Sequence, residues 1–184
     1  LKYIFGERKN TALLAAGVAG FLVLLLASAA FGDVVDDGLP PDAPQLVKTS
    51  ARQSIQNGLG QENVLGLTRA MLQNKFDAQQ IQLAHALMIE AQNSGMPVQP
   101  LMNKAYEGMA KGVDPSLIVG AIERVHSRNA FAFQRAAQLS GNKLQTTNLG
   151  RTLSAALAAG FSNADADKIS QMIHQRIKSK SSDE

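Results

Sequence analysis

A glycine, an aspartate and a proline stand close together near the middle of the chain, between two runs with helical spacing of apolar residues. In the first run these residues lie about one helical turn apart, at Leu101, Ala105 and Met109. Gly112 can take the positive φ at which many helices end. Asp114 can accept free amide hydrogens of a second helix, and Pro115 suits its first turn. The stretch therefore predicts an αα-hairpin.

The same hairpin pattern recurs on both sides of this stretch. One shift of the sequence against itself places Leu101 on Leu149 and Gly112 on Gly160, so we expect the two glycines to form equivalent turns. An opposite shift places Leu101 on Val64, although this weaker copy lacks the glycine. Hairpins of this kind cannot bury their apolar faces alone and have to stack on one another. The sequence thus predicts three degenerate αα-hairpin repeats.

Helical periodicity and helix-ending residues predict six helices in these repeats. We expect them at residues 64–75, 77–95, 98–111, 115–139, 149–159 and 164–177. No run of useful length alternates between apolar and polar residues, so strands are not expected. The predicted fold class is all-α, with about six helices in three hairpins that form a short helical stack or an irregular bundle.

The N-terminal segment, residues 1–32, has the layout of an export signal. Basic residues near the start precede an uncharged, mostly apolar run over residues 11–32, which closes in small residues. A signal peptidase would then cut before Asp33. The alternative is an uncleaved membrane anchor, because about 20 apolar residues span a bilayer. Both alternatives predict that the rest of the chain is exported, in the periplasm or outside the cell.

Residues 33–63 are acidic, contain several prolines and hold few apolar residues. This composition predicts a flexible tether with at most one short helix, over residues 45–56. The helical-repeat domain is then expected over residues 64–179. A short charged and serine-rich tail, residues 180–184, is expected to be disordered.

The absence of cysteine argues against thiol chemistry, and the charge balance argues against nucleic-acid binding. Without any cysteine the chain has no disulfide framework, no thiolate metal site and no thiol nucleophile. The formal net charge is +3, and residues 1–32 contribute +2 of it. Because the remainder is nearly balanced, we expect no binding to nucleic acid.

Candidate catalytic and metal-binding residues are few. The histidines, His85, His126 and His174, show no tight ligand spacing, and His85 is expected off the apolar face of its helix. Residues 163–167 resemble the start of a calcium loop, but the required glycine and glutamate further on are absent. Neither a Gly-x-Ser-x-Gly motif nor a carboxylate pair stands in a credible setting. We therefore predict no catalytic residue, no metal and no cofactor.

One face of the predicted helix over residues 115–139 carries the candidate binding residues. At 100° per residue, four side chains share one sector away from the apolar arc: Arg124, Arg128, Phe131 and Arg135. Arginine and aromatic residues dominate binding hot spots, and guanidinium groups suit carboxylates and phosphates. The alternative is that Phe131 packs under a neighbouring helix or the tether while the arginines stay solvated.

These features favour a non-catalytic, exported helical-repeat interaction module that docks a protein or an anionic cell-envelope component. We expect membrane contact only through the N-terminal segment, if it is uncleaved. Two alternatives stay open, a periplasmic carrier of an apolar ligand and a cell-envelope enzyme of unrecognised type. A closed apolar cavity would favour the carrier, and a cleft with a desolvated Glu or His would favour the enzyme. A filled core with an exposed basic and aromatic patch would favour the interaction module.

Overall fold

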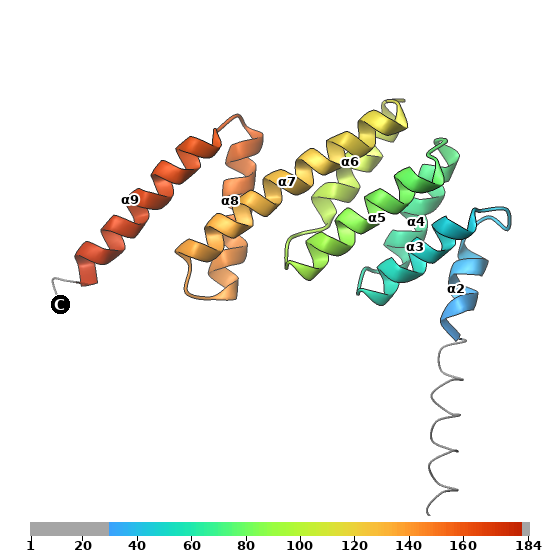
Figure 1. Cartoon of the computed structure of the whole chain (residues 1–184), viewed down its shortest axis with the longest axis horizontal. Helices are drawn as coiled ribbons and strands as arrows, with labels where there is room; N and C mark the ends of the chain where they lie inside the picture. The colour runs from blue at the N-terminus through green and yellow to red at the C-terminus, as the bar shows by residue number, and fades with distance from the viewer. Residues whose placement is uncertain (1–29, 182–184) are drawn as a thin grey trace, which may run out of the picture.

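The computed structural model describes residues 30–181, and this part of the chain is helical without any strand. Its helices are α2 (Ala30–Gly38), α3 (Gln45–Gln56), α4 (Gln61–Gln73), α5 (Ala78–Asn93), α6 (Gln99–Ala110), α7 (Pro115–Leu139), α8 (Lys143–Ala158) and α9 (Asn163–Ser181). Figure 1 shows them as an elongated row that runs from α2 at one end to α9 at the other. The predicted all-α fold class is confirmed.

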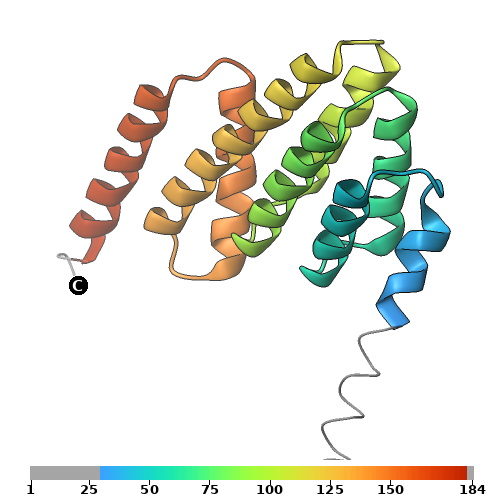
Figure 2. The same cartoon turned by 45° about the vertical axis from the view of Figure 1, so that its right-hand side comes forward.

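The helices lie in two layers. α3, α5 and α7 follow one another in one layer, and α4 and α6 lie behind them in the other (Figures 1 and 2). Each helix therefore contacts a helix next to it in the row rather than a distant one. The long helix α7 contacts α5, α6, α8 and α9, so it joins the two ends of the row.

Five helices end in the same backbone turn. Just past each end stands a residue with positive φ: Gly58, Lys75, Gly95, Gly112 and Gly160. The amide of the next residue, which is apolar, then donates to a carbonyl one turn back, as Val113 N does to Gly108 O at 3.0 Å and Phe161 N to Ala156 O at 3.1 Å. The equivalent turns predicted at Gly112 and Gly160 are therefore observed.

Local caps start the helices close to the predicted positions. The Asp114 carboxylate accepts a hydrogen bond from Ser116 N at 2.8 Å, and Pro115 opens α7 as predicted. α8 instead begins at Lys143, six residues before the predicted start at residue 149. The reason is that Asn142 Oδ1 accepts a hydrogen bond from Gln145 N at 3.0 Å and so caps the helix at an earlier residue.

Residues 34–63 contain the end of α2, all of α3 and the start of α4, and α3 has the bounds of the short helix expected over residues 45–56. α3 buries one face of small residues against its neighbours: Val47, Ser50, Ala51 and Ser54. Asp36 of α2 also lies 2.7 Å from Arg52 of α3. The prolines stand in the turn between these helices, where no ladder or helix needs their amide. Small residues bury little apolar surface individually, so the composition did not predict that this helix would pack against its neighbours.

The two ends of the chain fall largely outside the described residues. The predicted signal or anchor lies there except for Ala30–Gly32, which belong to α2, so a cut before Asp33 would fall within that helix. α9 continues to Ser181, and the last three residues of the predicted tail are not described. No helix in the described part has both the length and the apolar content required to cross a membrane.

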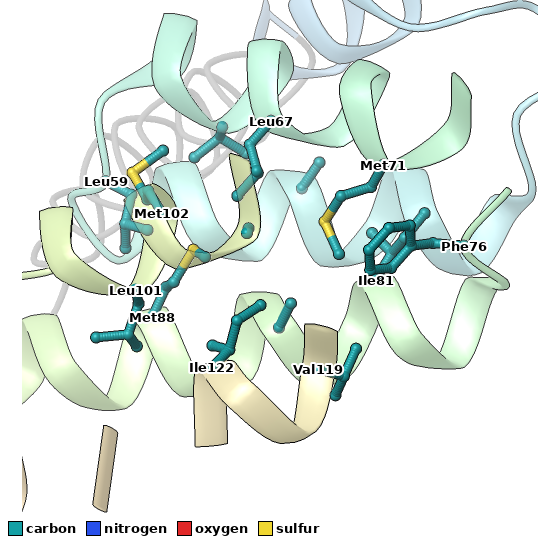
Figure 3. Close-up of a cluster of buried hydrophobic side chains, with 14 of the residues drawn as sticks. Leu59, Leu67, Met71, Phe76, Ile81, Met88, Leu101, Met102, Val119 and Ile122 are labelled. Atoms are coloured by element: carbon teal, nitrogen blue, oxygen red, sulfur yellow. The ribbon is translucent and has the colours of Figure 1, made fainter. Parts of the chain in front are cut away.

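Buried side chains form a large cluster and a small one. The large cluster extends from α2 to α7, and its fully buried members include Leu67, Met71, Ile81, Met88 and Leu101 (Figure 3). The small cluster joins the second half of α7 to α8 through Ala132, Ala136 and Leu153. Among the described side chains of α9, only Ala166 is buried. Packing therefore weakens from α7 toward the C-terminal end.

Candidate binding site

The four predicted binding residues lie on α7, but their surroundings differ. Arg124 is exposed, whereas Arg128, Phe131 and Arg135 are half-buried. The guanidinium carbon of Arg135 stands 5.3 Å from the centroid of the Phe131 ring, a cation–π geometry. Arg135 Nε also lies 2.8 Å from Asp167 Oδ1 of α9. Arg135 therefore forms an ion pair between α7 and α9, and the Asp167 carboxylate balances its charge.

Arg128 lines a cavity instead. This cavity, of about 420 Å³, lies between the start of α6, the middle of α7 and the second half of α8. Its polar lining consists of Gln99, Arg128, Asn129, Arg151 and Ser154. Its apolar lining consists of Pro97, Pro100, Phe133, Ala155 and Ala158. A volume of this size is typical of sites that hold a small ligand or part of a peptide.

Two buried hydrogen-bond donors of the cavity residues have no partner among the described residues. Asn129 is only 2% exposed, and the Ser154 hydroxyl donates to its Oδ1. Asn129 Nδ2 and Arg128 Nε are both buried and make no hydrogen bond among the described residues. A buried donor without an acceptor is unfavourable, so the cavity is suited to a ligand that brings acceptors.

The cavity carries positive charge that no neighbouring group compensates. Arg128 and Arg151 both line it, and its lining includes neither Asp nor Glu. In the described part of the chain, no carboxylate forms an ion pair with either guanidinium. The N-terminus of α6 adds partial positive charge, since Gln99 and Pro100 line the cavity and no side chain caps this helix. The site therefore favours an anion.

A close crossing of α7 and α8 forms the cavity. At Gly150, a Cβ atom would stand 2.8 Å from the Phe133 ring, too close for any larger residue without a shift. The glycine therefore lets the ring lie directly against the α8 backbone. Arg151 follows Gly150 in sequence, and Ser154 is one helical turn further on, so both face the same side of α7.

A second cavity, of about 440 Å³, shares Phe133 with the first as a lining residue. Glu90, Lys143, Thr146 and Thr147 line it together with mainly small and apolar residues. Glu90 is exposed and lies 3.6 Å from His126 Nε2, so its charge has a local partner when the imidazole is protonated. Opposite charges are both present here, and the cavity therefore has no single preference for anions or cations.

His85 is buried in the core, away from both cavities, contrary to its expected place off the apolar face. Its Nε2 lies 3.0 Å from Thr68 Oγ1, and its Nδ1 lies 3.0 Å from Ser50 Oγ. Burial lowers the pKa of the imidazole from 6.5 to about 4. Because its two ring nitrogens are already engaged by hydroxyl groups of α3 and α4, His85 has a structural role and does not form the desolvated cleft expected of an enzyme.

No other described group suggests metal chemistry. Among the side chains that the structure describes, which do not include His174, no three His, Asp or Glu stand close enough together to hold an ion. Met71 and Met88, whose sulfur atoms could bind a soft metal ion, are packed in the core. Comparison with known proteins adds no further assignment, because no family model, curated protein or solved structure matches the chain.

Sequence reasoning identified Arg128 but missed the residues that complete the cavity. Asn129 offered a signal, because it is a polar residue within the apolar arc of α7 and such residues need a partner when buried. The sequence around Arg151 and Ser154 gave no such signal. Their importance depends on how α8 crosses α7, which the spacing within either helix does not determine.

Proposed function

We propose that this protein is an exported, non-catalytic interaction module that docks an acidic segment of a partner protein along α7. One observation carries the proposal: Arg124, Arg128 and Arg151 offer guanidinium groups that no described carboxylate pairs with. Arg124 and Arg128 are one helical turn apart, and Arg128 shares its cavity with Arg151. These three arginines and Phe131 make up the proposed docking surface.

The arrangement of the helices supports a repeat-based scaffold for this surface. We propose that α4–α5, α6–α7 and α8–α9 are degenerate copies of one αα-hairpin, and that α2–α3 is a further copy. The shared helix ends support this, since Lys75, Gly112 and Gly160 each stand between the two helices of a hairpin. Short stacks of hairpins present extended surfaces, which suits binding to other proteins.

The interior argues against the two alternative functions. An apolar-ligand carrier needs empty apolar space, but Leu67, Met71 and Met88 are at most 1% exposed and pack in one large cluster. An enzyme of the expected kind needs a desolvated reactive group at a cavity, but the desolvated His85 stands in the core between hydroxyl groups, and Glu90, which lines the second cavity, is exposed. The basic surface on α7 and α8 is therefore the best-supported binding site.

Export is part of the proposal and rests on the N-terminal sequence, with its basic start and apolar run before Asp33. In a bacterial host, we expect the full gene product to yield a chain outside the cytoplasm that begins near Asp33. N-terminal sequencing of the exported form measures this directly. Recovery of the uncut chain from membranes would assign an anchor, and a purely cytosolic pool would contradict export.

Partner capture from cell-envelope extract tests the docking surface. We expect Arg124→Ala, Arg128→Ala and Phe131→Ala each to weaken capture of an acidic protein, while unfolding free energy changes by less than about 1 kcal/mol for the arginine variants. Lys168→Ala is the matched control, because it removes an exposed charge from α9. Equal capture by all variants would exclude this surface, and unfolding of Phe131→Ala would assign its ring to the core.

A further inference from the structure

We infer that the cavity between α6, α7 and α8 is a carboxylate-binding site that receives an acidic side chain of the docked segment. This deepens the proposed function and rests on it, since the acidic partner is the ligand in both. Arg128 and Arg151 supply the charge, and Asn129 Nδ2 supplies a buried donor. The site lies beside the α7 patch recognised in sequence and shares only Arg128 with it.

The orientation of Asn129 is the first evidence for a built site. The Ser154 hydroxyl donates to Asn129 Oδ1, so the amide nitrogen is left as the free end of the side chain. This nitrogen is buried, and Asn129 lines the cavity. A carboxylate oxygen is the acceptor that such a donor lacks.

The two guanidinium groups are the second and independent evidence. Two like charges that share a cavity repel each other, and no described carboxylate relieves the repulsion. A bound carboxylate would do so, because its two oxygens match the forked N–H groups of arginine. The uncapped N-terminus of α6 at the cavity wall acts in the same direction.

The apolar walls favour a peptide side chain over a free inorganic anion. Phe133, Pro97 and Pro100 line the cavity together with Ala155 and Ala158. The methylene groups of a glutamate and its neighbouring residues can cover these walls, whereas phosphate would leave them in contact with water. The volume of about 420 Å³ is also larger than a single small anion requires.

Fluorescence anisotropy of the full chain in detergent tests the inference, with fluorescein-labelled tetraglutamate as the probe. We expect saturable binding that unlabelled tetraglutamate competes away and that tetraglutamine and inorganic phosphate do not. Arg128→Gln and Arg151→Gln should each weaken it by about tenfold or more, because each removes a charge-assisted pair. Arg151→Lys should restore only part of the affinity, since it returns the charge without the fork.

Lys143→Gln is the matched control, because it makes the same charge change on α8 but Lys143 lines the second cavity and not the first. We expect it to weaken binding by less than about twofold. Circular dichroism melting of every variant confirms folding, and Arg151 is exposed enough to be replaced without loss of core contacts.

Three results would overturn the carboxylate site. They are no saturable binding by the wild type, equal weakening by Lys143→Gln and Arg151→Gln, and competition by phosphate as strong as by tetraglutamate. The proposed docking function is tested separately from the carboxylate site. If Arg124→Ala and Phe131→Ala still reduce partner capture while tetraglutamate does not bind, the docking surface stands and only the cavity is excluded. If tetraglutamate binds but partner capture is unchanged in those variants, the α7 surface is excluded and the cavity stands.

Discussion

At the scale of single residues, His85 makes the free energy of unfolding depend on pH. Its imidazole connects α5 to hydroxyl groups on α3 and α4. With a pKa of about 4 it is neutral near pH 7, so one ring nitrogen donates and the other accepts. Thr68 Oγ1 donates to Val64 O at 2.7 Å and can therefore accept from Nε2. Ser50 Oγ lies 3.0 Å from both Val47 O and His85 Nδ1, and its single proton can serve only one of them.

The lowered pKa of His85 predicts a loss of stability in acid. In the unfolded chain the imidazole takes up a proton below its ordinary pKa of 6.5, while the folded chain takes it up only near pH 4. Stability is therefore full above pH 6.5 and falls as the pH drops toward 4, by about 3 kcal/mol for this group. Urea unfolding across this range measures the slope, and His85→Gln should flatten it. An unchanged slope would show that other groups cause it.

The left-handed turn residues predict opposite effects of two substitutions. Lys75 has a φ of 62° and Gly112 a φ of 63°, so the same backbone turn holds a strained residue at one helix end and a relaxed one at the other. We expect Lys75→Gly to stabilise the protein and Gly112→Ala to destabilise it, each by about 1 kcal/mol. Thermal melting compares them, with Gly141→Ala as control. Changes of the same sign would contradict this assignment.

At the scale of elements, the crossing of α7 and α8 depends on Gly150. A methyl group there would meet the Phe133 ring at 2.8 Å, so Gly150→Ala should separate the helices and destabilise the protein by about 1–3 kcal/mol. Phe133→Leu in the same chain should recover part of this loss. Gly120→Ala on α7 is the control, because its Cβ would meet only the flexible Arg124 side chain, at 3.5 Å.

Urea unfolding of these variants provides the comparison. Equal stability of Gly150→Ala and Gly120→Ala would contradict the close crossing. The same crossing places Arg151 at the proposed carboxylate site, so Gly150→Ala should also weaken tetraglutamate binding. Stability and binding are then linked through one pair of helices.

At the scale of the whole molecule, the two clusters of buried residues predict uneven protection. The large cluster holds α2 to α7 together, whereas α8 rests on a small cluster and α9 buries Ala166 alone among its described side chains. We expect backbone amides of α8 and α9 to exchange with deuterium before those of α4 and α5. Asp167→Asn should accelerate exchange in α9 specifically, because it removes the ion pair with Arg135. Uniform protection along the row would show a single cooperative unit.

The sequence by itself determined the helices from α3 to α9 and most of their ends. Gly112, Asp114 and Pro115 act on neighbouring backbone groups, so their effect is local and can be read without knowing the rest of the fold. The shared face of Arg124, Arg128, Phe131 and Arg135 was predictable for the same reason, since it follows from helical geometry.

Only the tertiary structure decided what these elements meet. α3 is packed because the small residues Ser50 and Ala51 let it approach its neighbours, and small residues carry little signal in composition. Arg135 pairs with Asp167 of α9, while Arg128 and Asn129 meet Arg151 across a cavity. These contacts join residues distant in sequence, and their geometry is set by how closely two helices cross. Helical periodicity gives the direction of a side chain from its own axis, but it does not give the position of the neighbouring helix.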